Sequence, residues 1–154
     1  RRNRSFRTAM GLCMQHQLTP MHRYWADFTE QYKVRYVLWA FGTHKDDCEF
    51  IPYWKKGNPF SVSDGFIIGA YKRGTSTLFM VTNLGKAGTA EMKFDRKALG
   101  LAENTVLTDV MTREKFPDGR FSVPECEFRM LFAGPEEFGA MLEPPEPDMG
   151  FIIK

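Results

Sequence analysis

The sequence predicts a mainly β protein: an antiparallel β-sandwich of about six to eight strands, preceded by an N-terminal amphipathic helix segment, α+β overall. Three observations support this prediction. Short apolar or alternating runs recur between residues 61 and 133, with turn residues between them. One run, Leu78–Val81, is continuously apolar, as in a strand that is buried on both faces. The next run, Thr89–Phe94, alternates apolar and polar residues, as in a strand with one wet face.

The first region, residues 1–59, carries the helical signal. Thr19 is a candidate N-cap with Pro20 at the first helical position, and Gly42 suits the left-handed residue that ends a helix. An aromatic stripe at helical spacing is predicted to face the core: Met21, Trp25, Phe28, Tyr32, Tyr36 and Trp39. A second apolar set widens it: Val34, Val37, Leu38 and Phe41. The preceding run, Ala9–Leu18, is predicted to be a buried strand, which together with the helix forms half of a βαβ unit.

The stretch from Thr43 to Phe60 has a charge cluster, two prolines and a glycine, so we expect a loop with one extended piece around Phe50–Tyr53. Strands are then predicted within Gly65–Tyr71, Thr77–Leu84, Thr89–Phe94, Thr105–Val110, Arg113–Val123 and Cys126–Ala133. Gly69 marks a bulge or a close approach of another segment. Pro117-Asp118-Gly119 supplies a turn. The sandwich is therefore assigned to 60–135, and 136–154 to a proline-rich tail that wraps over the domain or leads into an interdomain connection.

Composition and charge exclude several classes of protein. The chain has 154 residues, 43% of them hydrophobic and 14% aromatic, which is enough for one packed core. A net charge of +2 is too small for a nucleic-acid partner, and no apolar stretch approaches the roughly 20 residues of a membrane span. The start at Arg1, in a charged context without an initiating Met, indicates a piece of a longer polypeptide.

Three cysteines, Cys13, Cys48 and Cys126, lie far apart and lack the paired spacing of a zinc ribbon. We interpret them as buried free thiols, with one disulfide in an oxidising compartment as the alternative. His16, His22 and His44 match no metal-ligand motif either. We therefore expect no metal and no other cofactor.

Two aromatic residues, Tyr53 and Trp54, are candidates for substrate binding. They precede two lysines, and aromatic faces stack on the C–H faces of sugars while nearby polar groups supply hydrogen bonds. The alternative is that both rings seal the contact between the helix and the sandwich. No catalytic residue is assigned. The acidic cluster is interpreted as solvated loop charge, because adjacent carboxylates rarely face each other across a substrate; it comprises Asp46, Asp47 and Glu49.

The pattern of strands and turns between Gly65 and Gly134 can be compared with a known family. Its distinctive parts are a strand that ends in Val81-Thr82-Asn83, the "LGL" of Leu99–Leu101, a D-x-x-T turn of Asp109 and Thr112, and the hairpin residues Asp118–Val123. This pattern resembles the C-terminal β-domain of (β/α)8-barrel glycoside hydrolases. It is most similar to uncharacterised bacterial glycosidases in which "EFIPYW", Glu49–Trp54 here, also precedes the β-domain.

The resemblance implies a non-catalytic C-terminal accessory domain that stabilises the catalytic barrel of the same polypeptide and shapes its carbohydrate cleft. The alternative is a free-standing carbohydrate-binding or protein-interaction module. Residues 1–59 are then the end of the barrel, so His16, after the last barrel strand, is a third candidate for contact with the oligosaccharide, as is Gln15. A surface or capping role is the alternative for His16. The resemblance also implies a secreted or periplasmic location.

Overall fold

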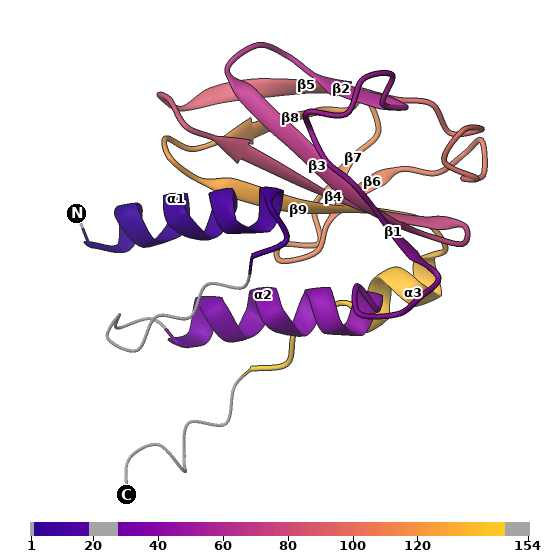
Figure 1. Cartoon of the computed structure of the whole chain (residues 1–154), viewed down its shortest axis with the longest axis horizontal. Helices are drawn as coiled ribbons and strands as arrows, with labels where there is room; N and C mark the ends of the chain where they lie inside the picture. Colours follow the sequence, from indigo (N-terminus) through magenta and orange to yellow (C-terminus); the bar gives the residue numbers. More distant parts are fainter. Residues whose placement is uncertain (1, 19–27, 147–154) are drawn as a thin grey trace, which may run out of the picture.

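The fold has three layers: helices, a large sheet and a small sheet (Figure 1). The computed structural model describes residues 2–18 and 28–146. Within them the elements are α1 (Arg2–Gln15), α2 (Phe28–Phe41), β1 (Cys48–Ile51), β2 (Phe60–Val62), β3 (Phe66–Arg73), β4 (Ser76–Asn83), β5 (Gly88–Phe94), β6 (Leu107–Asp109), β7 (Lys115–Phe116), β8 (Arg120–Val123), β9 (Phe128–Ala133) and α3 (Glu136–Met141). The large sheet has the order β1-β3-β4-β9-β6-β7 and the small sheet β2-β5-β8. All neighbouring strands are antiparallel, which confirms the predicted β-sandwich with an N-terminal helix.

Every run between Gly65 and Ala133 that was predicted to hold a strand does so, and the run Arg113–Val123 holds two, β7 and β8. The extended piece expected around Phe50–Tyr53 is β1, which ends earlier, at Ile51. Strand β2 was not predicted, because three residues directly after Pro59 are too few to show a period. Its first residue, Phe60, is buried in the sandwich core.

The prediction of a strand at Ala9–Leu18 is wrong, because most of this run lies in α1. A short apolar run does not distinguish a strand from a helix. Here Met10 and Met14 are both buried and lie four residues apart, which is the spacing of one helix face. The predicted half βαβ unit is therefore absent from the described residues, and α1 and α2 lie side by side on one face of the large sheet (Figure 1).

Helix α2 buries the second predicted apolar set but not the aromatic stripe. Val34, Val37 and Phe41 are buried as predicted, whereas Trp39 is 68% exposed and Tyr32 is 40% exposed. Both faces of this helix are apolar, so the 3.6 period alone did not decide between them. The predictions for Thr19, Pro20, Met21, His22 and Trp25, for the side chain of Phe28 and for the tail beyond residue 146 lie outside the described residues.

Strand β4 is buried along its whole length, as predicted, because it lies in the middle layer. Phe79 and Val81 belong to the core between the two sheets, and Leu78 and Met80 to the core between the large sheet and the helices. The predicted two-sheet sandwich accounts for the burial of Phe79 and Val81, but Leu78 and Met80 are buried by the helices. In contrast, β5 alternates between buried and exposed residues, because its outer face meets solvent.

The side chain of Gln15 holds the end of α1 on the large sheet. It is fully buried, and its Nε2 donates to the carbonyl oxygen of Met80 at 2.7 Å and to Thr82 Oγ1 at 3.1 Å. Gly69 on β3 makes room for it, since a Cβ at this position would lie 2.7 Å from Gln15 Oε1. Gly69 therefore marks a close approach, one of the two predicted alternatives. Because a buried amide donor left without partners costs about 1–3 kcal/mol, these bonds fix where the helix ends.

A cation in the middle of α1 adds a second attachment. Arg7 forms ion pairs with Glu30 on α2 and with Glu127, which directly precedes β9. Its guanidinium also lies over the ring of Phe128, 4.8 Å from the centroid. Arg7 therefore connects α1 and α2 to Glu127 just before β9.

The asparagine at the end of β4 holds two connections together. Asn83 Nδ2 lies within hydrogen-bond distance of the carbonyl oxygens of Lys86, Val123 and Pro124, at 2.8, 3.2 and 3.0 Å. Its Oδ1 accepts from the Gly85 amide at 2.9 Å. The strand-final Asn of the resemblance is therefore a structural residue in this chain.

The D-x-x-T turn is built around Asp109, which is only 2% exposed. Its Oδ1 accepts from the amides of Met111 and Thr112, at 2.8 and 3.0 Å. Its Oδ2 accepts from Arg129 Nη1 on the neighbouring strand β9, at 2.7 Å. The carboxylate thus closes the turn after β6 and pairs with the half-buried Arg129, so its hydrogen-bonding capacity is used within the fold.

The start of the predicted tail packs on the domain. Helix α3 lies beside the C-terminal end of α2 (Figure 1). Its Phe138 ring stacks on Phe41, with centroids 5.7 Å apart, and meets Phe132 edge-on at the same distance. Leu142 is fully buried in the same core. The domain boundaries at 59/60 and 135/136 stay predictions, although β1 pairs with β3 and α3 packs on α2 across them.

Replacing Gly69 with Ala should lower the free energy of unfolding by about 2 kcal/mol, because the new methyl group meets a Gln15 side chain that cannot move aside. Urea unfolding followed by circular dichroism measures the change. Gly85→Ala is the matched control, since its Cβ would meet Asn83 Oδ1 at an ordinary 3.7 Å. In a Gln15→Ala background the cost of Gly69→Ala should fall, and an unchanged cost would contradict the steric explanation.

Replacing Asp109 with Ala should cost about 3 kcal/mol of stability, because it opens the turn and leaves the Arg129 guanidinium without its carboxylate. Asp95→Ala is the control. The exposed Asp95 also accepts a turn amide, from Ala98 at 3.0 Å, but has no buried cation beside it, so its loss should cost about 1 kcal/mol. Equal losses in urea unfolding would show that the ion pair adds nothing.

Candidate functional site

Three of the four residues predicted to contact substrate lie together, although they come from two segments. The prediction for the fourth, Gln15, is wrong, because its side chain is fully buried against the large sheet. His16 follows α1, and Tyr53 and Trp54 follow β1. The His16 ring stacks on the Trp54 ring, with centroids 5.1 Å apart and an interplanar angle of 22°. The Tyr53 ring meets both edge-on, at 5.8 Å from His16 and 4.9 Å from Trp54. We call these three residues the aromatic cluster.

Local backbone structure places the cluster. Helix α1 ends at Gln15, and His16 lies in the following turn, where its amide donates to the Cys13 carbonyl at 3.1 Å. On the other side Pro52, which lacks an amide N–H, ends β1. Its carbonyl accepts from the Lys55 amide at 3.1 Å and from Asn58 Nδ2 at 2.9 Å, so the cluster's other two residues lie in a closed turn.

The cluster lies at the surface. Trp54 is 54% exposed and Tyr53 is 39% exposed, and His16 is exposed as well. One face of Trp54 is covered by His16, and Phe50 contacts it at an angle of 68° with centroids 6.4 Å apart. The indole is therefore held on two sides while more than half of its surface stays open to solvent.

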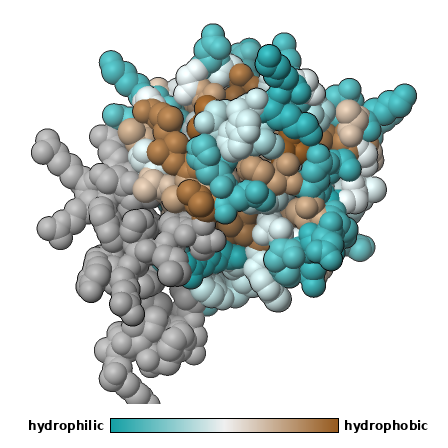
Figure 2. All heavy atoms as spheres, in the orientation of Figure 1, coloured by the Kyte–Doolittle hydropathy of each residue, from teal (hydrophilic) through white to brown (hydrophobic). Residues whose placement is uncertain are grey.

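The face drawn in Figure 2 is mixed rather than uniformly apolar. Hydrophobic residues reach the surface there in several areas separated by hydrophilic side chains. Exposed apolar side chains on the described residues include Leu12, Leu18, Trp39 and Met141 as well as the cluster's own rings. Single exposed apolar residues are normal, so the arrangement of the rings, rather than overall hydrophobicity, distinguishes the cluster.

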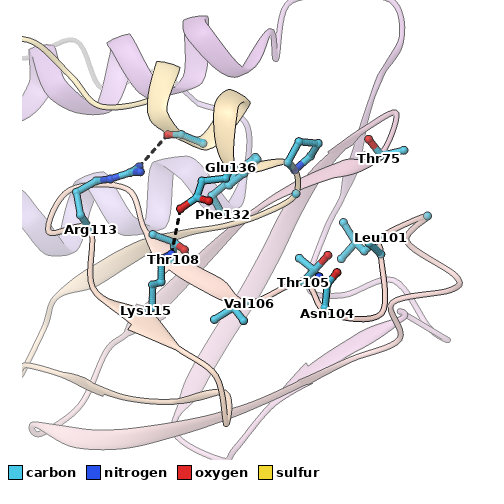
Figure 3. A pocket seen from close by; sticks show the side chains of 15 residues that line it. Thr75, Leu101, Asn104, Thr105, Val106, Thr108, Arg113, Lys115, Phe132 and Glu136 are labelled. Carbon is cyan, nitrogen blue, oxygen red and sulfur yellow. Dashed lines mark hydrogen bonds and ion pairs between the residues drawn. The ribbon is translucent and has the colours of Figure 1, made fainter.

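A hollow of about 750 Å³ lies elsewhere, between the loop before β6, the β6–β7 turn and α3 (Figure 3). Apolar, amide and hydroxyl side chains line it, among them Leu101, Val106, Asn104, Thr105 and Thr108. Its two cations reach α3: Lys115 pairs with Glu136 at 3.1 Å, and Arg113 Nη1 donates to the Gly139 carbonyl at 2.8 Å. Glu136 is the one carboxylate in the lining, so no pair of carboxylates faces across this hollow.

The acidic loop residues Asp46, Asp47 and Glu49 are exposed, and the last two form separate ion pairs. Asp47 pairs with Arg73 at 2.9 Å, and Glu49 pairs with Lys55 at 3.4 Å. Within residues 2–18 and 28–146 no group of three or more His, Cys, Asp or Glu side chains is placed to hold a metal ion. In the same ranges no helix is long and apolar enough to cross a membrane.

The three cysteines are free and half-buried, rather than fully buried as predicted. Burial raises the pKa of the Cys13 thiol above its ordinary value. Burial also raises the pKa of Cys48; the nearby Arg73 opposes the rise and Asp47 adds to it. A raised pKa lowers the fraction of thiolate at neutral pH, so neither Cys13 nor Cys48 is activated as a nucleophile.

A second exposed tryptophan also stacks on a histidine. Trp39 on α2 lies 6.2 Å from His44, with an interplanar angle of 13° between the rings. The sequence reasoning missed this pair because it assigned Trp39 to the core. The available signal was its spacing: Val34, Val37 and Phe41 share one face of the helix, and Trp39 lies outside it.

Comparisons with protein-family models, with curated proteins and with solved structures found no match to this chain. The resemblance to glycoside hydrolase β-domains therefore stays a prediction, which depends on the strand and turn residues themselves. The structure adds the fold and the contact among His16, Tyr53 and Trp54. It also shows that the side chains of Asp109 and Asn83 are hydrogen-bonded within the fold.

Proposed function

We propose that this chain is a non-catalytic accessory domain of a glycoside hydrolase, and that the aromatic cluster contacts carbohydrate. The single observation that carries the proposal is the packing of His16, Tyr53 and Trp54 into one exposed group of rings. In this role the domain packs on the catalytic barrel of the same polypeptide and stabilises it, since burial of apolar surface yields about 25 cal/mol per Å².

The chemistry of the cluster suits a sugar. The Trp54 ring offers an apolar face to the C–H groups of a pyranose, and the His16 nitrogens and the Tyr53 hydroxyl hydrogen-bond to its hydroxyl groups. Because His16 and Phe50 already hold the indole, little side-chain freedom is lost when a ligand binds. A fixed, half-exposed ring is therefore a better binding surface than a free one.

The distribution of carboxylates supports a non-catalytic role. Glycoside hydrolysis uses two carboxyl groups about 5 to 9.5 Å apart on opposite sides of the scissile bond. In the described residues Asp47, Glu49 and Glu136 are exposed and paired with separate cations. Asp109 is buried within its turn and bonded to Arg129. Glu136 faces no other carboxylate across its hollow. Asp109 does line a second hollow with Glu30, Glu127, Glu143 and Glu146, but each of these four glutamates is paired with a cation and the oxygens of Asp109 are bonded within its turn and to Arg129.

A second candidate role is structural, and the same contact favours it. The stack of His16 on Trp54 joins the end of α1 to the loop after β1, so the rings also seal the helix layer against the sheet. A free-standing carbohydrate-binding or protein-interaction module is the further alternative. The two roles predict different effects of removing the rings. A structural seal predicts a loss of stability, and a sugar contact predicts a loss of binding.

Replacing both Tyr53 and Trp54 with Ala should abolish the retardation of the protein on oligosaccharide affinity gels and shift its melting temperature by no more than about 2 °C. The small shift is expected because both side chains are substantially exposed. Tyr32→Ala, at another exposed ring outside the cluster, is the control and should bind like the unaltered chain. A fall in melting temperature of about 5 °C or more, with binding retained, would support the seal and contradict the sugar contact.

The unaltered chain should release no nitrophenol from a panel of nitrophenyl glycosides that covers both anomers of the common hexoses and pentoses. Release in proportion to protein concentration would overturn the non-catalytic assignment. Asp109→Ala and Asp47→Ala would then show whether either carboxylate takes part.

A further inference from the structure

The end of α1 has exposed tryptophan rings on two sides. On one side His16 stacks on Trp54. On the other side Gln17 and Leu18 line a groove together with Trp39 of α2. Two residues along a chain, Cα atoms are at most about 7 Å apart, so His16 and Leu18 bring the two surfaces close together. Gln17 between them has a left-handed φ of 55°, which turns the chain at this point.

The groove has a volume of about 350 Å³ and a mixed lining. Met14 and Leu38 supply apolar surface, and Gln17, Thr43 and His44 supply hydrogen-bonding groups. The 68% exposed ring of Trp39 also lines it, and its stack on His44 has the same form as that of Trp54 on His16. An aromatic face with both apolar and hydrogen-bonding neighbours suits a ligand that has C–H faces and hydroxyl edges.

Tyr71 lies in the lining of the groove and adds a fixed polar group. It is 6% exposed and its hydroxyl is hydrogen-bonded to Gln17. Burial raises the pKa of Tyr71 above its ordinary value, so the hydroxyl stays neutral over the physiological range. A neutral hydroxyl and the side-chain amide of Gln17 together recognise uncharged hydroxyl groups rather than a cation.

We propose that Trp39, His44 and this groove form a second sugar contact, so that the domain binds a linear oligosaccharide across the turn at the end of α1. The inference rests on the proposed carbohydrate contact at the aromatic cluster and names its ligand class: a chain of several sugar units rather than one ring. Two weak contacts joined through one ligand bind more tightly than either alone, because the second contact forms within the complex.

Nuclear magnetic resonance of the indole Nε1–H groups tests the proposal. The chain has three Trp, and the Trp39→Ala and Trp54→Ala variants each remove one signal and so assign it. Cellohexaose, maltohexaose and xylohexaose are titrated in turn. One of them should shift the signals of both Trp39 and Trp54. Trp39→Ala should weaken binding of that hexasaccharide about tenfold, and leave the binding of the corresponding disaccharide at Trp54 unchanged.

The controls separate the two proposals. Tyr32→Ala removes another exposed ring of α2 that is not part of the groove, and should leave the affinity for the hexasaccharide unchanged. A shift of the Trp54 signal without one of Trp39 would overturn the second contact and retain the proposed function. No shift of either signal with any of the three hexasaccharides would overturn both. Movement of the Trp39 signal on dilution without sugar would identify this face as a contact between copies of the chain, and would overturn the second contact.

Discussion

The hydrogen bonds between Gln15 and the large sheet are the constraint on which the helix layer and both aromatic surfaces depend. The side chain enters the sheet where Gly69 leaves space, and its Nε2 is held by the Met80 carbonyl and Thr82 Oγ1. Everything at the end of α1 is placed from this point. His16 follows directly and stacks on Trp54, and Leu18 follows two residues later and lines the groove beside Trp39. A buried polar residue thus has a direct effect on the surface that the proposed function uses.

Most of the strands could be predicted from the sequence, because each of them has a local signature, and β2, with three residues, is the exception. The continuous apolar run of β4, the alternation of β5 and the Pro-Asp-Gly turn before β8 each act over a few residues. The third layer could not be predicted, because it depends on contacts between residues far apart in the chain. Leu78 and Met80 showed that β4 has two buried faces, but not that helices cover the second one. The same lack of long-range information left the strand at Ala9–Leu18 and the aromatic stripe of α2 wrongly assigned.

In the candidate site, too, the sequence indicated individual residues but not the contacts between them. Tyr53 and Trp54 were selected for their chemistry and His16 for its place after a supposed barrel strand, but nothing in the sequence indicates that residues 16 and 54 touch. Their contact requires β1 to end before Pro52, which is a local effect, and α1 to end against β3, which results from packing on the sheet. Trp39 was missed because large aromatic rings are usually buried, and because α2 carries apolar residues on two faces, which gives the period little contrast. An exposed Trp therefore has to be found from its contacts.

The middle position of the large sheet also determines where this polypeptide can be divided. Leu78 and Met80 on β4, and Met130 and Phe132 on β9, are covered by α1, α2 and α3 rather than by the small sheet. A fragment made of residues 60–135 would keep the core between the sheets and expose this second row of side chains, and it would also leave β3 without its β1 neighbour. Such a fragment would present an open apolar face and a bare strand edge, the two features that drive association between chains. A fragment that keeps both cores therefore has to extend from α1 to Leu142.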